Sequence, residues 1–187
     1  MNVANWITTA RIIVVVPFVV LVYFLKNSEV QNPTSNWMSW ILVLGFIIIA
    51  ASDALDGHLA RSRNEVTDLG KFLDPIADKV LVLGTLFVLN IVNVLPLWIT
   101  IVITARELAI TLLRLWIKKY KHTVIAASIF GKLKTVSQCL LIGFYLAPLA
   151  FLPVFFTYLA QAILYIALLL TILSAIEYFY KTLVDKK

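Results

Sequence analysis

The chain has 187 residues, of which 61% are hydrophobic and 14% are charged, with a formal net charge of +6. Soluble domains are about half apolar and about a quarter charged, so this composition excludes an ordinary soluble protein and indicates a membrane protein. Each membrane-spanning helix needs about 20 mostly apolar residues, which leaves room for about six spans and for no separate soluble domain.

Six apolar runs, separated by polar or proline-bearing breaks, predict six helices in chain order. They are expected near residues 6–25, 37–61, 73–93, 97–118, 132–149 and 154–180. The first run is longer than the apolar core of a signal peptide and lacks a small-x-small cleavage site before Lys26, so we expect it to be retained. The predicted fold class is therefore all-α, a polytopic six-transmembrane-helix bundle that forms one domain over residues 1–187.

The lysines and arginines predict the orientation of the bundle. With an even number of spans, the N-terminus, the connections over 62–72 and 119–131, and the C-terminus share one side of the membrane. All basic residues except Lys26 lie near that side. Because cytoplasmic connections carry an excess of lysine and arginine, we expect this side to be cytoplasmic.

Four aspartates lie at the neighbouring ends of the second and third predicted spans. Asp53 and Asp56 are three residues apart, and Asp74 and Asp78 are four apart, so each pair shares one face of its helix. A charge within a span costs several kcal/mol, which a bound cation would offset. Carboxylates without a histidine or cysteine cluster favour hard divalent ions such as Mg²⁺ or Mn²⁺, and four carboxylates have enough oxygens for two ions. A cation transporter or a proton relay lined by carboxylates is the alternative on chemistry alone.

The spacing of these residues is more specific than their charge. It follows the pattern Asp53-x2-Asp56-Gly57-x2-Ala60-Arg61-x8-Gly70-x3-Asp74-x3-Asp78. This pattern resembles the signature of the CDP-alcohol phosphotransferase family at every specified position. The resemblance covers the whole chain, and it implies six membrane helices, an N-terminal interfacial stretch and a polar cavity that faces the cytoplasm.

The same resemblance implies roles for individual residues. Two divalent ions, Mg²⁺ or Mn²⁺, would be held by Asp53, Asp56, Asp74 and Asp78 and would bridge the diphosphate of a CDP-linked donor, with Asp78 as the general base. Gly57, Ala60 and Gly70 would pack against the cytidine, and Arg61 would support the donor or the acidic cluster. Asn5 and Thr9 resemble the family's N-terminal donor-site elements less specifically.

The acceptor alcohol must be inferred from other residues, because members of the family use different alcohols. The segments Thr104-Ala-Arg106-Glu107 and Gly131-Lys132-Leu-Lys134-Thr135 resemble the bacterial phosphatidylglycerophosphate synthase branch of the family, which implies glycerol 3-phosphate. Four cations, Arg106, Arg114, Lys132 and Lys134, are expected to bind its phosphate through charge-assisted hydrogen bonds. Alternatively, Arg106 pairs with Glu107 or the aspartates, and the lysines mark the membrane boundary.

These implications add up to a specific expectation of activity. The chain would transfer a phosphatidyl group from CDP-diacylglycerol to glycerol 3-phosphate, as a multi-pass protein of the bacterial cell membrane with its active site towards the cytoplasm. Phosphatidylglycerol, serine or inositol phosphate are alternative acceptors for the same chemistry. The resemblance also implies a homodimer among membrane lipids, and no nucleic-acid partner is expected.

Overall fold

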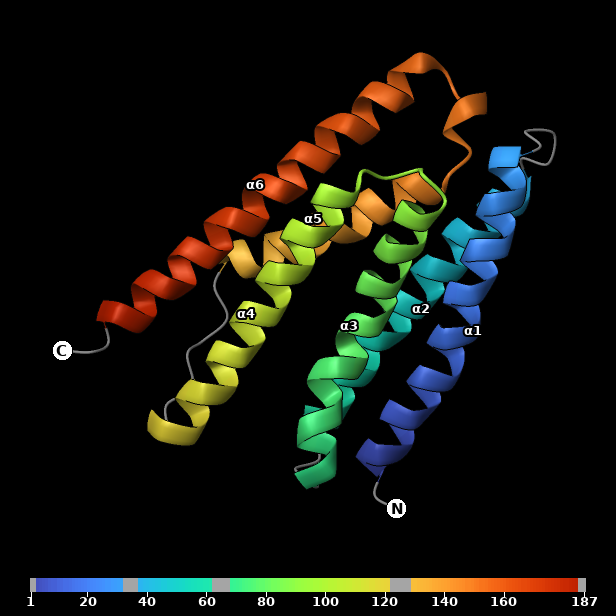
Figure 1. The fold of residues 1–187 in the computed structure, drawn as a ribbon. Helices are drawn as coiled ribbons and strands as arrows, with labels where there is room; N and C mark the ends of the chain where they lie inside the picture. Colours follow the sequence, from blue (N-terminus) through green and yellow to red (C-terminus); the bar gives the residue numbers. More distant parts are fainter. Residues whose placement is uncertain (1–2, 32–36, 62–67, 122–128, 185–187) are drawn as a thin grey trace. The chain divides into compact units, whose positions relative to one another are not determined.

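The computed structural model describes the backbone of residues 3–31, 37–61, 68–121 and 129–184, and the side chains of 13–31, 38–52, 79–114, 116, 117 and 129–182. Every regular element in this part of the chain is a helix (Figure 1), so the all-α prediction is confirmed. The α-helices are α1 (Val3–Gln31), α2 (Trp37–Arg61), α3 (Asp68–Ile91), α4 (Leu97–Lys121), α5 (Ile129–Leu146) and α6 (Val154–Val184), and a short 3₁₀ helix, η1 (Leu149–Phe151), precedes α6.

The helices have the lengths and compositions of membrane spans. Three described segments, Ile13–Gln31, Ile129–Leu146 and Val154–Thr182, are long and apolar enough to cross a bilayer, and Met38–Ser52 and Lys79–Ile91 are shorter apolar helical segments. Helix α4 is less apolar because it carries Arg106, Glu107 and Arg114 within its length. The protein is thus a polytopic helical membrane protein.

The predicted helix boundaries agree with the structure for both ends of α2 and for the starts of α4 and α6, which follow Pro96 and Pro153. Helix α2 has the predicted bounds, whereas α1 continues six residues past the expected end at residue 25, to Gln31. The helix continues because Lys26 and Glu29, three residues apart, form an ion pair along it with a distance of 2.8 Å. The N-terminal stretch for which an interfacial position was expected is the first part of this continuous helix.

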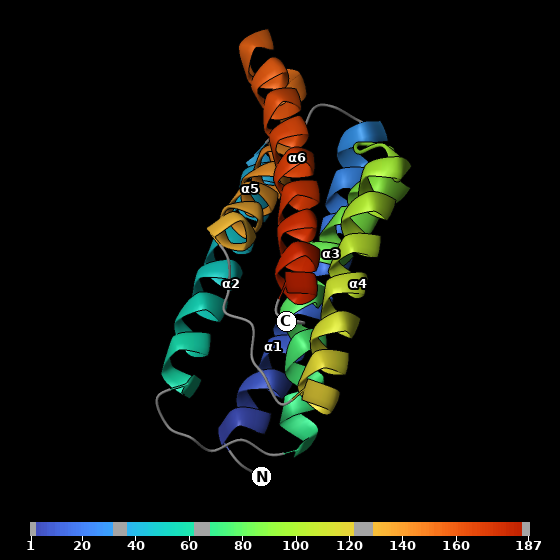
Figure 2. The same ribbon diagram turned by 90° about the vertical axis from the view of Figure 1, so that its left-hand side faces the viewer.

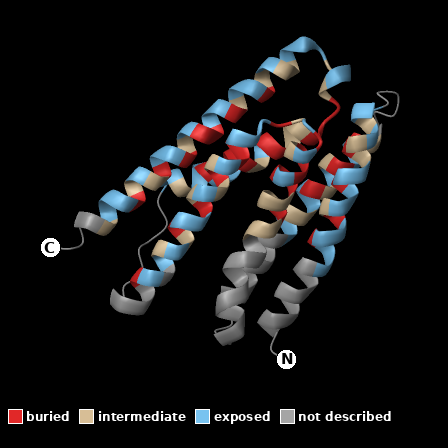
Figure 3. Ribbon diagram, viewed as in Figure 1, coloured by how far each residue is buried: buried red, intermediate tan, exposed pale blue. Residues whose placement is uncertain are grey.

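The chain forms two compact units. The first contains residues 1–95 and 142–153, and the second contains residues 96–141 and 154–187. In the first unit, α1 packs against both α2 and α3, and Figure 3 shows buried positions along these three helices. The expectation of one domain over residues 1–187 stays a prediction.

Two glycines allow α1 to approach its neighbours in the first unit. A Cβ atom added to Gly45 on α2 would lie 2.9 Å from Cε2 of Phe18, and one added to Gly84 on α3 would lie 3.2 Å from Cγ2 of Val19. Small residues are common at such contacts because they let helix backbones approach closely. The core of this unit includes the fully buried side chains Val15, Val22, Leu42, Phe46, Leu86 and Leu89.

A lysine joins three elements at the end of α1 in the same unit. Lys26 is 3% exposed, and its ammonium donates to the carbonyl oxygens of Leu146 and Ala147, at 3.2 Å and 3.4 Å, where α5 ends. Glu29 pairs with this ammonium and also accepts a hydrogen bond from the Ser39 hydroxyl on α2. The last carbonyls of α5 therefore receive a cation, as the helix dipole favours.

The turn after α3 confirms the break expected between the apolar runs at 73–93 and 97–118. Asn93 has a positive φ of 58°, a conformation that asparagine tolerates better than most residues. The backbone N–H groups of Val94 and Leu95 both donate to the carbonyl of Leu89, at 2.9 Å and 3.0 Å. These bonds satisfy the end of the helix before the chain turns into α4.

In the second unit, α4 packs along α6, and Figure 2 shows the two helices side by side. Ile110 and Ile117 of α4 and Tyr178 of α6 form a buried apolar cluster there. The guanidinium carbon of Arg114 lies 5.1 Å from the centre of the Tyr178 ring, within the range of a cation–π interaction.

Candidate functional site

The four aspartates of the signature lie on two helices of the first unit. Asp53 and Asp56 belong to the C-terminal part of α2, and Asp74 and Asp78 to the first half of α3. The helical backbone therefore keeps the spacing that places each pair on one face of its helix. Their side chains lie outside the described residues, so the convergence of the four carboxylates stays a prediction.

The residues assigned to donor binding also lie outside the described side chains. The helices place them in the first turns of α1, in the last turns of α2 and near the start of α3. They are Asn5, Thr9, Gly57, Ala60, Arg61 and Gly70. Within the described side chains, no group of three or more histidine, cysteine, aspartate or glutamate residues is placed to hold a metal ion.

Two of the four predicted phosphate-binding cations meet on one carboxylate in the second unit. Nη1 of Arg106 on α4 lies 3.1 Å from Oε1 of Glu107, and the ammonium of Lys134 on α5 pairs with the same oxygen. The three side chains are about a tenth exposed or less. The structure therefore contains the pairing of Arg106 with Glu107 that was the alternative to phosphate binding, and it adds Lys134 to the pair. Phosphate binding by these cations stays a prediction.

A serine on α6 completes this arrangement. Nη2 of Arg106 donates to the hydroxyl of Ser174 at 2.7 Å, and Ser174 itself donates to the carbonyl of Thr171 at 3.0 Å. Thr171 in turn accepts a hydrogen bond from the side-chain amide of Gln138 at 3.3 Å. We call Arg106, Glu107, Lys134 and Ser174 the Glu107 cluster.

Sequence reasoning did not identify Ser174 or Thr171 as neighbours of the cations. A usable signal was present, because these two buried residues lie three positions apart on the same face of α6, which is otherwise strongly apolar. Polar residues at helical spacing within an apolar span often hydrogen-bond across to another helix.

The Glu107 cluster keeps hydrogen-bonding capacity for a ligand. A guanidinium has five N–H donors, and Nε of Arg106 is buried without a hydrogen-bond partner in the described part of the chain. The buried Thr104 hydroxyl, two residues before Arg106, likewise has none there. A buried donor without a partner costs free energy, so an anionic ligand with several acceptor oxygens would be favoured at this position.

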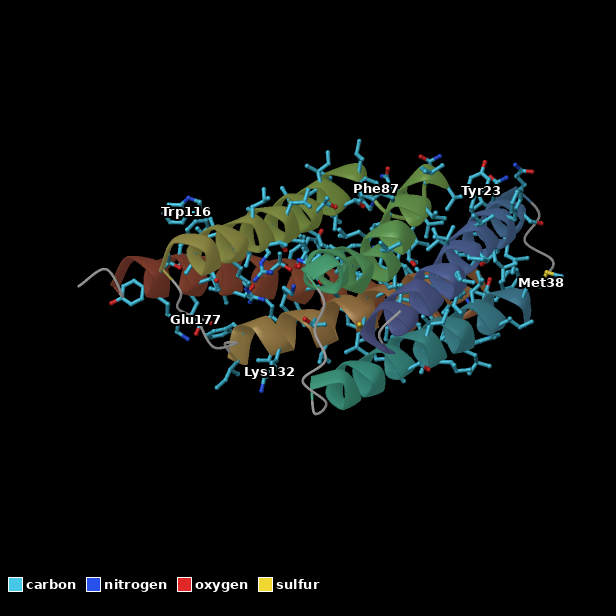
Figure 4. The ribbon with its side chains drawn as sticks, turned by 90° about the horizontal axis from the view of Figure 1, so that it is seen from below. Tyr23, Met38, Phe87, Trp116, Lys132 and Glu177 are labelled. Atoms are coloured by element: carbon cyan, nitrogen blue, oxygen red, sulfur yellow. The ribbon has the colours of Figure 1, made fainter. Side chains whose placement is uncertain are left out.

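The other two predicted cations have different surroundings. Arg114 lies over the ring of Tyr178, whereas Lys132 is exposed and points away from α4 and α6, as Figure 4 shows. Lys132 and Lys134 are two residues apart, which separates their side chains by about 200° around a helix. Only one of the two can therefore face the interior of the unit, and it is Lys134, which is 6% exposed.

Similarity to known proteins decides the family. The CDP-alcohol phosphatidyltransferase family model matches residues 1–173, which include all four aspartates and the four predicted cations. The chain belongs to this family. The resemblance seen in the aspartate spacing is thus confirmed. In this CDP-alcohol phosphatidyltransferase, helices α2 and α3 carry the signature residues, and helices α4 and α5 carry the four predicted cations.

Relatives of this CDP-alcohol phosphatidyltransferase match along nearly the whole chain. The CDP-diacylglycerol–glycerol-3-phosphate 3-phosphatidyltransferase of Bacillus subtilis is 37% identical over 187 residues, which cover 96% of this chain and 94% of the relative. The protein of the same name from Haemophilus influenzae is 36% identical, with 95% and 91% covered. A probable phosphatidylglycerophosphate synthase of Mycobacterium tuberculosis is 34% identical, with 98% and 83% covered.

Proposed function

We propose that the chain transfers the phosphatidyl group of CDP-diacylglycerol to glycerol 3-phosphate, which yields phosphatidylglycerophosphate and CMP in phospholipid biosynthesis. The observation that carries this proposal is the similarity to relatives named for that reaction, at 34–37% identity and over at least 95% of the chain. The family match over residues 1–173 supports the transfer chemistry independently of those names.

The residues of the signature supply the steps of the reaction. A hydroxyl oxygen of glycerol 3-phosphate attacks the phosphorus that carries the diacylglycerol, and Asp78 accepts the hydroxyl proton as general base. A new P–O bond forms to the acceptor, and the P–O bond to the cytidylate breaks, so that CMP leaves with the electron pair. No covalent intermediate with the protein is needed.

The donor set of the signature fits divalent metal. Asp53, Asp56, Asp74 and Asp78 offer carboxylate oxygens from two helices, which suit Mg²⁺ or Mn²⁺ and provide enough ligands for two ions. When bound, the ions supply charge neutralisation at the diphosphate and polarise its phosphorus–oxygen bonds. The four aspartates would hold these ions, and Asp78 would serve both as a metal ligand and as the general base.

The acceptor phosphate is bound by the cations of the second unit. Arg106 and Lys134 are proposed as its main ligands, because they come together on Glu107 and Arg106 retains an unpartnered donor in the described part of the chain. Lys132, at the exposed side of α5, and Arg114, over Tyr178, are proposed as outer contacts that attract the dianion.

The donor nucleotide is proposed to lie against small residues. Gly57, Ala60 and Gly70 have the small side chains that let a flat base approach a backbone closely. Arg61 supports the donor or the acidic cluster. Asn5 and Thr9 are proposed as additional donor contacts from the start of α1.

The setting of the reaction is proposed from the sequence. The lysine and arginine bias supports a bacterial cell membrane protein with its active site towards the cytoplasm. Labelling of cysteines introduced at residues 35 and 187 by a membrane-impermeant reagent tests the orientation, because only the first should react in intact cells. The resemblance also supports a homodimer, which native mass spectrometry from detergent would detect.

The function is tested by CMP release from the purified protein with CDP-diacylglycerol and Mg²⁺ or Mn²⁺. Glycerol 3-phosphate, serine, inositol phosphate and phosphatidylglycerol are compared as acceptors. Release that depends on glycerol 3-phosphate is the expected result. Release with another acceptor alone would retain the chemistry and overturn the acceptor. Metal flux into proteoliposomes without CMP release would instead support a carboxylate-lined cation transporter.

A further inference from the structure

A single carboxylate holds two cations from two helices in the second unit. Oε1 of Glu107 pairs with Nη1 of Arg106 at 3.1 Å and with the ammonium of Lys134, which belongs to α5. Glu107 is 6% exposed and Lys134 is 6% exposed, so water screens these charges only weakly. The position of each cation therefore depends strongly on the carboxylate.

Like charges at this proximity repel each other, and burial strengthens the repulsion. Without an anion between them, the guanidinium of Arg106 and the ammonium of Lys134 would move apart or recruit other counter-charges. Glu107 is adjacent to Arg106 in the sequence and 27 residues from Lys134. Because Arg106 and Lys134 lie on different helices, their separation is not set by local sequence, and the shared carboxylate of Glu107 sets it instead.

Ser174 on α6 also orients the guanidinium of Arg106. Its hydroxyl accepts from Nη2 of Arg106 at 2.7 Å and donates to the carbonyl of Thr171, so that both of its hydrogen-bonding functions are engaged. With Nη1 on Glu107 and Nη2 on Ser174, the plane of the guanidinium is fixed. The Nε donor, one of those still available, then has one defined direction, and it has no partner in the described part of the chain.

We propose that Glu107 is a positioning residue for acceptor binding. It holds Arg106 and Lys134 at one spacing, and with Ser174 it aims their remaining N–H donors at the phosphate of the acceptor. This inference rests on the proposed function, because it assigns Glu107 a role towards the acceptor of that reaction. Glu107 itself does not contact the phosphate, since two anions would repel.

The test is Glu107→Gln, which keeps the shape of the side chain and one acceptor oxygen but removes the charge. We expect KM for glycerol 3-phosphate to rise about tenfold or more, with KM for CDP-diacylglycerol within about twofold of the wild type. Glu107→Asp, which restores the charge on a shorter side chain, should recover part of the loss. A purely structural role would change both KM values or the amount of folded protein.

Glu177→Gln is the matched control, because Glu177 on α6 also pairs with a lysine, Lys181, at 2.7 Å, but in a more exposed position than Glu107. It should leave both KM values at wild-type levels. Equal KM values for glycerol 3-phosphate in Glu107→Gln and Glu177→Gln would overturn the positioning role.

A second variant keeps the inference testable if Glu107→Gln does not fold. Ser174→Ala removes the contact to Nη2 of Arg106 together with the local hydrogen bond to the carbonyl of Thr171, and we expect a rise of about threefold in KM for glycerol 3-phosphate. An unchanged KM in this variant would then overturn the inference. Failure of the proposed function can be told apart from failure of the positioning role. If the proposed function is wrong, the wild-type protein itself releases no CMP with glycerol 3-phosphate.

Discussion

The ammonium of Lys26 on α1 donates to the carbonyl oxygen of Leu146 at the end of α5, 3.2 Å away. This lysine is the one basic residue predicted on the far side of the membrane from all others. Its charge is compensated by Glu29 and by the carbonyl groups at the end of α5. Lys26 is therefore compatible with the membrane orientation that the other lysines and arginines favour.

Replacement of Lys26 by methionine should therefore destabilise the first unit. Methionine preserves the length of the side chain but leaves Glu29 without its ammonium partner and removes the donor to two carbonyls. Breaking a buried ion pair on one side costs about 3 kcal/mol or more. Thermal unfolding in detergent should show a clear decrease in midpoint. Lys181→Met, which breaks an exposed pair with Glu177, should change stability by less than about 1 kcal/mol.

The close contacts of α1 predict opposite effects of the same substitution at three glycines. Gly45→Ala should destabilise by about 1–2 kcal/mol, because the new methyl group would lie 2.9 Å from the buried Phe18 ring. Gly84→Ala, with its contact at 3.2 Å to Val19, should have a smaller effect. Gly143→Ala is the control, because no atom lies within 4 Å of the added carbon, and it should stabilise α5 by up to about 1 kcal/mol.

Asp78→Asn should abolish turnover, since it removes both the proposed base and one metal ligand while it preserves shape. We expect CMP release to fall by about 100-fold or more. Asp68→Asn is the matched control, because Asp68 is the first residue of α3 but lies outside the signature. Near-normal CMP release from Asp78→Asn would reject the role of Asp78.

Removal of divalent metal should stop the reaction reversibly. Protein treated with EDTA and then freed of it should release no CMP, and Mg²⁺ or Mn²⁺ should restore release. A variant with Asp53→Asn and Asp74→Asn should need much higher metal concentrations for the same rate. Full activity in the presence of excess EDTA would contradict a metal-dependent mechanism.

The opposite orientations of Lys132 and Lys134 predict unequal effects on the acceptor. Lys134→Ala removes a buried cation of the Glu107 cluster, and KM for glycerol 3-phosphate should rise about tenfold or more. Lys132→Ala removes an exposed charge and should cause a smaller rise that disappears at high salt. Equal effects of the two substitutions on KM would show that the buried Lys134 contributes no more to acceptor binding than the exposed Lys132.

The periodicity and polarity of the sequence were sufficient to predict the helices. The start of α2 was predictable because Trp37 follows a polar segment, and the starts of α4 and α6 were predictable because each follows a proline. The end of α1 was predicted too early, since a lysine usually indicates the end of an apolar run, whereas Lys26 is buried against α5. The partner of Lys26, the carbonyl of Leu146, is 120 residues away in the sequence, so the local sequence pattern does not indicate it.

The candidate site was predictable only in part. The aspartate spacing identified the family, because four carboxylates at fixed spacing within apolar helices are rare and costly. The distinct surroundings of Arg106, Arg114, Lys132 and Lys134 were not predictable, because they depend on which helix faces contact each other. The spacing of Thr171 and Ser174 indicates a polar contact to another helix, but the identity of that partner, Arg106, depends on the packing of α6 against α4.

The length of α6 has a consequence for the lipid around the protein. Its apolar segment, Val154–Thr182, has 29 residues and spans about 44 Å at 1.5 Å per residue, whereas the hydrocarbon core of a bilayer is about 30 Å thick. Hydrophobic mismatch of this size is relieved by tilting of the helix or by thickening of the bilayer around it. Since Ser174 lies on α6 and holds Arg106, lipids with longer or shorter acyl chains are expected to alter the geometry of the Glu107 cluster.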